Sequence, residues 1–453
     1  MPILEEKLRR RTAERKAIEQ KVRNEPFKPT PEELEYAHQV MERISDEFAQ
    51  PIAAQGIDAL KEEITKAVNC ACLAIPVSRE SQLRIAHTAL STMLGLGPIQ
   101  EYLDDPKVTE IVVQRYDNIV VERAGKIQKV DTVFSSEEQL KTIINRIVQG
   151  VNRQVTITTP IVDARLKDGS RVNATIPPVS PDGSTLTIRK FNQRALTGED
   201  YLNAGSLSRK MLYFLERCVT GRITIFVSGG TGTGKTTMLN MLSQFVPQDE
   251  LIITIEDTLE LKLQQPNVRR MEVRRASSRD MMDVDQNALV KAALRQRPDR
   301  IILGETRDGS IVDLISAMST GHEGSMSTIH ANSAQSMCDV RVPILYSMNP
   351  EANFSEKSIA LQLAEAIQII VQLSRLPDGS RKVTEIAWVD GVTSSYKVNC
   401  VDLFRYNIEE NCFEATGVVP DDLIRRIRMH GLDFDESIFE KGSSGPVTSR
   451  TVL

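Results

Sequence analysis

A short glycine-rich segment, SGGTGTGKTTML at residues 228–239, carries the clearest chemistry in the chain. Its spacing, two glycines four residues apart followed by a lysine and a threonine, is typical of a phosphate-binding loop. Glycines let successive main-chain N–H groups point at phosphate oxygens, and the helix that follows adds positive potential. The sequence therefore predicts a nucleoside triphosphate site at Gly229, Gly230, Thr231, Gly232, Thr233, Gly234, Lys235, Thr236 and Thr237.

Two apolar stretches further along end in carboxylates. RIILGE places Glu305 at its end, and LIITIED places Glu256 and Asp257, with Glu260 one turn beyond. Ligands gather at the carboxyl ends of parallel strands, where a carboxylate can orient water or hold Mg²⁺. We predict catalytic roles for Glu305 and Glu256, and metal binding by both together with the hydroxyl of Thr236. The alternative is that these are solvated charges at strand ends.

Two histidines, His322 and His330, occur in STGHEGSMSTIHAN, about one helix and one strand after Glu305. Near a terminal phosphate an imidazole can donate a hydrogen bond and report whether phosphate is present. A buried or capping histidine is the alternative for each, and the lack of nearby cysteine argues against zinc. We predict that both histidines belong to the catalytic group.

The bulk composition fits a globular protein of two or three domains. The chain has 453 residues, 41% hydrophobic and 26% charged, with a net charge of −5. This charge gives no general footprint for nucleic acid or an anionic membrane. No apolar run is long enough to cross a bilayer, the charged start does not resemble a secretion signal, and six scattered cysteines suit a reducing cytoplasm.

Residues before 105 look helical, and Thr30, Pro31 and Glu33 have the types expected at a helix start. Strands and one helix follow, with a hairpin turning at Asp168-Gly169. After a polar stretch, strands and helices alternate, which predicts a largely parallel sheet. One of these helices carries a predicted capping box, Ser310 with Asp313. The expected organisation is a helical extension (1–104), an α+β domain (105–192), a linker (193–208), an α/β domain (209–405) and a C-terminal segment with a disordered tail (406–453).

Five motifs in this order resemble the secretion and pilus-assembly ATPases of the type II/type IV superfamily, most of all its Tad/Flp pilus branch. They are VDARLKDGSRVNATIPP, VSGGTGTGKTTMLN, TIEDTLEL, LRQRPDRIILGETRDG and TGHEGSMSTIHAN. The resemblance runs from about residue 94 to residue 391, roughly two thirds of the chain. It implies ATP and Mg²⁺ as ligands, a RecA-like domain and a PAS-like amino-terminal domain.

The resemblance also implies roles for individual residues. Lys235 and Thr236 match the Walker A loop, Glu256 with Asp257 the acidic box and Glu305 the Walker-B-type carboxylate. His322 and His330 match the His box. Arginines that reach the terminal phosphate, often across a subunit boundary, match Arg165, Arg171 and Arg189 in the amino-terminal domain, and Arg269, Arg270 and Arg274 after the acidic box.

Whether Arg165 and Arg171 share a face depends on the loop of their hairpin, because one residue of slip reverses a strand. Structural salt bridges are the alternative for these arginines. Asp308 and Ser310 depart from the pattern of the Tad branch, and the arginine expected after HAN matches only Arg341 loosely. A conjugation or type IV secretion member therefore stays open.

The expected function is a cytoplasmic, six-membered ring that hydrolyses ATP and pushes on platform proteins at the inner membrane, to extrude or retract pilin or to secrete protein. The alternatives are a DNA-translocating or conjugation motor, a scaffold that binds ATP without hydrolysis, and a metabolic kinase. The acidic net charge speaks against nucleic acid as partner, and RRMEVRRASSR (269–279) lacks aromatic residues for stacking on bases.

Overall fold

The computed structural model divides the chain into two compact units, residues 1–192 and 193–453. The structure describes residues 29–55, 59–123, 125–150, 153–166, 168–191, 195–274, 282–350 and 353–446. The basic segment before residue 29 and the last seven residues lie outside these ranges. Within them, no helix has the length and apolar character needed to cross a membrane. The domain boundaries expected from the sequence stay a prediction.

The first unit opens with helices α2 (Pro31–Gln55), α3 (Lys61–Leu73), α4 (Arg79–Leu94), η1 (Gly97–Ile99) and α5 (Gln100–Asp104). Helix α2 begins as its sequence predicts, because Thr30 and Glu33 exchange side-chain hydrogen bonds with each other's main-chain N–H groups, at 3.2 and 2.9 Å. Apolar residues at helical spacing meet between α2, α3 and α4, with Ile44, Ile64 and Ile85 at the centre of their core. The expected N-terminal helices are confirmed.

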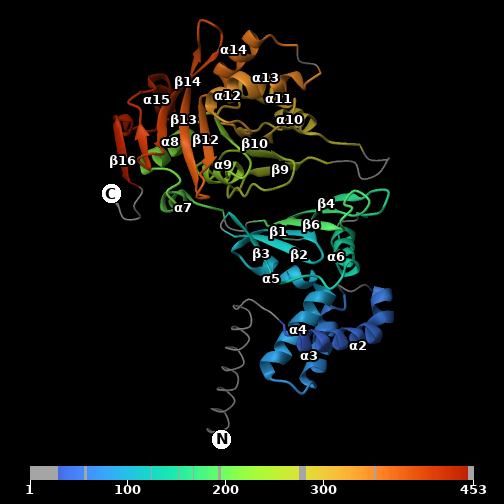
Figure 1. Cartoon of the computed structure of the whole chain (residues 1–453). Helices are drawn as coiled ribbons and strands as arrows, with labels where there is room; N and C mark the ends of the chain where they lie inside the picture. Colours follow the sequence, from blue (N-terminus) through green and yellow to red (C-terminus); the bar gives the residue numbers. More distant parts are fainter. Residues whose placement is uncertain are drawn as a thin grey trace. The chain divides into compact units, whose positions relative to one another are not determined.

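A six-stranded antiparallel sheet and one helix complete the first unit (Figure 1). The elements are β1 (Val108–Arg115), β2 (Asn118–Arg123), β3 (Lys126–Lys129), α6 (Glu137–Gln149), β4 (Ile161–Arg165), β5 (Arg171–Thr175) and β6 (Thr185–Arg189). The strand order is β3-β2-β1-β6-β5-β4. Helix α6 packs its apolar face, which includes Ile143 and Ile144, against alternate residues of the strands, such as Ile111 and Ile188. The predicted hairpin turns at Asp168-Gly169 as expected.

The second unit is built on a ten-stranded sheet in the order β16-β15-β14-β13-β12-β7-β11-β10-β8-β9. The strands are β7 (Ile225–Gly229), β8 (Ile252–Glu256), β9 (Val268–Glu272), β10 (Arg300–Thr306), β11 (Met326–Ile329), β12 (Ile369–Arg375), β13 (Arg381–Val392), β14 (Val398–Asn407), β15 (Cys412–Ala415) and β16 (Gly442–Pro446). The six strands from β12 to β9 are parallel, and β13 to β16 extend them antiparallel.

Helices cover both faces of this sheet, as Figure 1 shows. The helices are α7 (Gly198–Asn203), α8 (Arg209–Thr220), α9 (Lys235–Ser243), α10 (Gln286–Leu294), α11 (Ile311–Ser319), α12 (Ala334–Ser336), η2 (Met337–Arg341), α13 (Val342–Ser347), α14 (Glu356–Ala366), α15 (Asp421–Met429) and η3 (Glu436–Phe439). One apolar core joins α8, α9 and α15 to the sheet, and a second joins α10, α11, α13 and α14 to it. The predicted RecA-like α/β fold is confirmed.

Two segments differ from the sequence-based expectation. The stretch expected as a linker contains helix α7, which a capping box between Thr197 and Asp200 starts, and it buries Tyr201 and Leu207 in the core of the second unit. Because most residues of this stretch are polar, its sequence did not predict that a few of them pack in the core. The tail expected to be disordered begins with β16, which pairs with β15, because main-chain hydrogen bonds at a sheet edge need no apolar side chains.

Candidate active site

The glycine-rich segment joins β7 to α9 at the carboxyl edge of the parallel strands. Strand β12 passes so close to Gly229 that a methyl group there would lie 2.6 Å from the main-chain oxygen of Leu373. It would also lie 2.7 Å from Oγ1 of Thr233 in the loop itself. Gly234, the residue before α9, has a φ of +95°, which other residues adopt only with strain. Oγ1 of Thr233 donates to the main-chain oxygen of Gly230 at 2.9 Å. Glycine is therefore required for this turn from strand to helix.

Lys235, the first residue of α9, is buried and turns back over the loop. Its Nζ donates to the main-chain oxygen of Gly230 at 2.9 Å and lies 3.3 Å from both ring nitrogens of His330. Three threonines of the same segment are accessible to solvent: Thr231, Thr236 and Thr237. The lysine thus puts a positive charge beside the loop that would hold phosphates.

His330 lies within hydrogen-bonding distance of both Lys235 and Glu305. Glu305 lies near the end of β10, and His330 follows β11, which lies between β10 and β7. Nε2 of His330 is 2.9 Å from Oε1 of Glu305, and their side chains are 38% and 35% exposed, so a substrate can reach both. Burial lowers the pKa of His330, and the Lys235 charge lowers it further while Glu305 opposes the shift. His330 is therefore neutral at pH 7.

This group combines an ammonium, a carboxylate and a neutral imidazole within hydrogen-bonding reach. The ammonium can stabilise negative charge on a phosphate, and the carboxylate can accept a proton from an attacking water or orient it. The neutral imidazole of His330, in the tautomer that places the proton on Nε2, holds the carboxylate of Glu305 in place. Such an arrangement suits the hydrolysis of a phosphoanhydride.

Glu256 ends β8, the strand next to β10, but its side chain turns inward and is only 2% exposed. Its Oε2 accepts the main-chain N–H groups of Glu260 and Leu261, at 2.6 and 2.8 Å. Burial raises the pKa of Glu256 in spite of these hydrogen bonds. Among the described residues, Oε1 of Glu256 is buried without a hydrogen-bond partner. One oxygen of Glu256 thus fixes the loop after β8.

Asp257, the second carboxylate of this pair, forms an ion pair with Arg307. Arg307 directly follows β10, so the ion pair ties the loop after β8 to the loop after β10. Asp257 therefore stabilises the loops that follow the strands of Glu256 and Glu305.

The predicted capping box at Ser310 is wrong. Ser310 precedes α11, but its φ and ψ of −63° and −17° are already helical and its side chain does not cap the helix. Its hydroxyl instead donates to Oε1 of Gln286 at 3.0 Å, and Nε2 of Gln286 donates to the main-chain oxygen of Glu305 at 2.9 Å. Sequence reasoning missed Gln286, because its partners lie 19 and 24 residues away and no short motif marks it.

The structure does not bring His322 to the Lys235 group. His322 precedes β11 and His330 follows it, so the four residues of the strand, at roughly 3.3 Å each, separate the two by about 13 Å or more. Nδ1 of His322 lies 3.3 Å from the main-chain oxygen of Ala317, and Oγ of Ser325 donates to the main-chain oxygen of His322 at 2.7 Å. His322 therefore closes the end of α11.

Arg165, Arg171 and Arg189 form one row across the sheet of the first unit. Arg165 is paired directly with Arg171 between β4 and β5, and Arg171 with Arg189 between β5 and β6. Directly paired residues project from the same face of a sheet, so the hairpin places all three on one face. Arg189 is in turn paired with Glu110 of β1, which brings an opposite charge to the row, and Nε of Arg165 donates to the main-chain oxygen of Gly169 at 3.2 Å.

The arginines predicted after the acidic box do not share one face, because Arg269 and Arg270 are neighbours on the edge strand β9. Arg270 is paired with Thr254 of β8 and so shares the face of Glu256, and its charge opposes the rise in the pKa of Glu256. Arg269, one residue earlier, points to the opposite face. Arg274 follows the strand and pairs through its main chain with the segment before α10. The remainder of this basic stretch falls in residues 275–281, outside the described residues.

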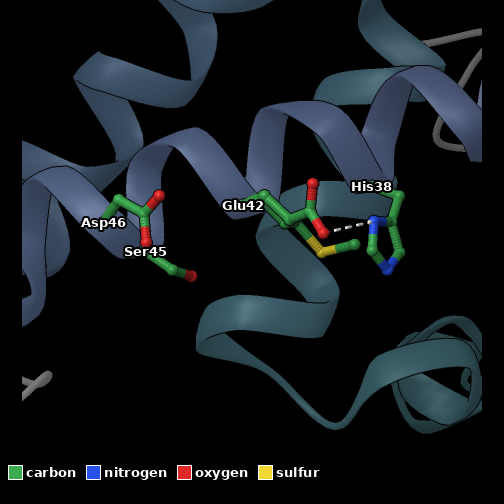
Figure 2. Close-up of a pocket in the computed structure, with 5 residues that line it drawn as sticks. His38, Glu42, Ser45 and Asp46 are labelled. Carbon is green, nitrogen blue, oxygen red and sulfur yellow. Dashed lines mark ion pairs between the residues drawn. The ribbon is translucent and has the colours of Figure 1, made fainter.

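A hollow on helix α2 in the first unit is a separate feature (Figure 2). Its lining includes His38, Glu42, Ser45 and Asp46 from one face of the helix. Nδ1 of His38 lies 3.6 Å from Oε1 of Glu42, and both side chains are about two thirds exposed. Surface pairs of this kind contribute little to binding or stability, and no motif of the sequence falls here.

A family model described as "Type II/IV secretion system protein" matches residues 92–407, which is 316 of the 453 residues. The match includes the antiparallel sheet of the first unit, the glycine-rich loop and the strands that carry Glu305 and His330. The chain belongs to this family. The coarser part of the resemblance stated above, the secretion ATPase superfamily, is thereby confirmed.

Individual members of the type II/IV secretion system family align over most of their length. The chain is 30% identical to the type IV secretion system protein VirB11 of Bartonella henselae, over 66% of this chain and 93% of that protein. It is 30% identical to the conjugal transfer protein TrbB of Rhizobium radiobacter, over 65% of this chain and 87% of that protein. The VirB11 ATPase of Brucella suis, solved with sulphate, covers 67% of this chain and 95% of its own length at 28% identity and a TM-score of 0.36.

This member of the type II/IV secretion system family is an ATPase. The donors at this edge of the sheet suit Mg²⁺, because the hydroxyl of Thr236 and the carboxylate of Glu305 are oxygens that solvent can reach. Mg²⁺ held there would neutralise charge on phosphate oxygens.

Proposed function

We propose that this ATPase is a hexameric motor that powers assembly or retraction of a Tad-type pilus, or protein secretion across the cell envelope. The observation that carries the proposal is the convergence of Lys235, His330 and Glu305 at one edge of the parallel sheet. The motifs shared with the Tad/Flp branch support the pilus as its task. Its partners would be platform proteins of the inner membrane, with the chain on the cytoplasmic side.

The geometry suggests how this group acts on ATP. Lys235 would exchange the main-chain oxygen of Gly230 for a phosphate oxygen, which carries more charge. One oxygen of the Glu305 carboxylate would accept a hydrogen bond from neutral His330, which keeps the side chain in place. The carboxylate would orient the attacking water and take its proton. Thr236 and Glu256 would complete the oxygen donors for Mg²⁺. We assign no contact with ATP to His322.

The arginine row supplies a reason for a ring. Arg165, Arg171 and Arg189 lie on one face of the first unit and suit an anion, and a head-to-tail interface that closes would offer them to the nucleotide of the next subunit. An arginine delivered in this way stabilises charge in the transition state of phosphoryl transfer. We propose that the active site is completed by this row from a neighbouring copy.

Mixing two inactive variants tests the shared site. One variant carries Lys235→Ala and has lost the loop lysine; the other carries Arg165→Ala, Arg171→Ala and Arg189→Ala and has lost the row. Each should be inactive alone. In a randomly mixed ring, half of the loops are intact and half of their neighbours donate an intact row, so about a quarter of wild-type turnover should return. A mixture that stays inactive would contradict a site shared between subunits.

A second candidate is a motor for DNA transfer, because the similar proteins above include a conjugal transfer protein. The two are separated by complementing a strain that lacks this gene with wild type or with Glu305→Gln. A pilus motor predicts that only wild type restores surface filaments, and that DNA does not stimulate phosphate release by the purified protein. Intact filaments with lost DNA transfer would support the second candidate instead.

A further inference from the structure

Two arginines of the second unit lie beside the phosphate-binding loop and belong to none of the sequence motifs. Strand β12 pairs in parallel with β7, and Leu373 is paired with Gly229 at the start of the loop. Arg375, two residues later, ends β12 and therefore lies beside the loop. A methyl group built on Gly232 would lie 3.7 Å from Nη1 of Arg375. One built on Gly234 would lie 3.5 Å from Cδ of Arg381, the first residue of β13.

The two arginines lie at directly opposite positions of one hairpin. Arg375 and Arg381 are directly paired across the antiparallel β12–β13 hairpin, and both are exposed. Two like charges at directly opposite positions destabilise a hairpin. The two guanidinium groups therefore bring two positive charges to one place beside the loop.

The strand order separates these arginines from the hydrolytic group. Strand β11, which His330 follows, and strand β10, which contains Glu305, lie on one side of β7, and β12 and β13 lie on the other. The loop thus has a side with a carboxylate and an imidazole, where a phosphate would be cleaved, and a side with two guanidinium groups. Guanidinium groups bind phosphate oxygens through charge-assisted, often bidentate hydrogen bonds.

We propose that Arg375 and Arg381 bind the polyphosphate of the nucleotide held by the same chain's loop, on the side away from the bond that is cleaved. The proposal rests on the proposed role of this loop in binding ATP. Because these contacts are made to phosphates that stay on the nucleotide, they hold ATP and ADP alike. Such uniform binding affects KM and the affinity for ADP, but not kcat.

Binding of a fluorescent ADP analogue and steady-state ATP hydrolysis test the proposal. Arg381→Ala and Arg375→Ala should each weaken ADP binding and raise KM about tenfold, with kcat within about twofold of wild type. Arg381→Lys should recover part of the affinity, because it keeps the charge without the planar fork. The matched control is Arg425→Ala, an exposed arginine of α15 in the same unit, which should bind ADP like wild type.

Two results would overturn the proposal: ADP affinity within twofold of wild type in the variant that lacks both arginines, or a fall in kcat at unchanged ADP affinity. Lys235→Ala is measured beside these variants. If Lys235→Ala also binds ADP as tightly as wild type, the assignment of the loop and the proposed function fail. If it loses ADP while the arginine variants keep it, only the role of Arg375 and Arg381 fails.

Discussion

Buried Gln286 forms hydrogen bonds with both Glu305 and Ser310, and replacing it tests whether Gln286 positions Glu305 or only stabilises the fold. Gln286→Leu keeps the volume of the side chain but removes both hydrogen bonds, to the main-chain oxygen of Glu305 and from the hydroxyl of Ser310. Each group left unpaired costs about 1–3 kcal/mol, so the free energy of unfolding should fall by about 2–6 kcal/mol. The end of β10 would also shift, and a displacement of about 1 Å at Glu305 lowers kcat up to about 100-fold.

The control is Gln265→Leu, because Gln265 is another buried glutamine of the second unit. Its Nε2 donates to the main-chain oxygens of Ser243 and Val246, at 2.7 and 3.0 Å, away from Glu305. Denaturant unfolding and kcat at saturating Mg-ATP are measured for both variants. Both should lose stability, but only Gln286→Leu should lose kcat by tenfold or more. Equal loss of kcat in the two variants would refute the positioning role.

Three further predictions concern stability and the loop. Arg300→Met removes the fully buried one of the two arginines that pair with Glu250, leaving Arg222 at 3.1 Å, and should lower the free energy of unfolding by about 3 kcal/mol in denaturant titrations; a loss below 1 kcal/mol would contradict this. Gly229→Ala places a methyl group 2.6 Å from a main-chain oxygen of β12, and should weaken binding of a fluorescent ADP about tenfold or more, whereas unchanged binding would show that the loop has room. Burial and the nearby Asp402 raise the pKa of Glu385 to about 7, so folding takes up a proton, and the stability from that proton is lost as pH rises from about 4.5 through 7. Glu385→Gln should therefore gain stability over wild type between pH 5 and pH 8 in thermal melts, and a constant difference would rule this out.

The parts of the molecule that follow local rules could be predicted from the sequence. The alternation of apolar strands and helices predicted the parallel sheet, and Thr30 with Glu33 predicted the start of α2, because both depend on residues within a few positions of each other. The glycine-rich segment predicted a strand, a tight loop and a helix, and the structure has them at β7 and α9. Its role in binding ATP stays a prediction.

The rest depends on contacts that spacing alone does not determine. His322 and His330 are similar in sequence context, but they lie beyond opposite ends of the four-residue strand β11. Ser310 has the type and position of a helix cap, yet a partner 24 residues earlier takes its hydroxyl. Arg165 and Arg171 could be placed on one face only when the register of their hairpin was known. In each case tertiary pairing decides the outcome.

The most direct test of the account is phosphate release by the wild-type protein and by Glu305→Gln, measured beside the binding of a fluorescent ATP analogue. The substitution keeps the size of the side chain and removes the carboxylate that faces His330. The account predicts that Glu305→Gln binds nucleotide like wild type and releases phosphate at least about 100-fold more slowly. Undiminished phosphate release by Glu305→Gln would contradict it.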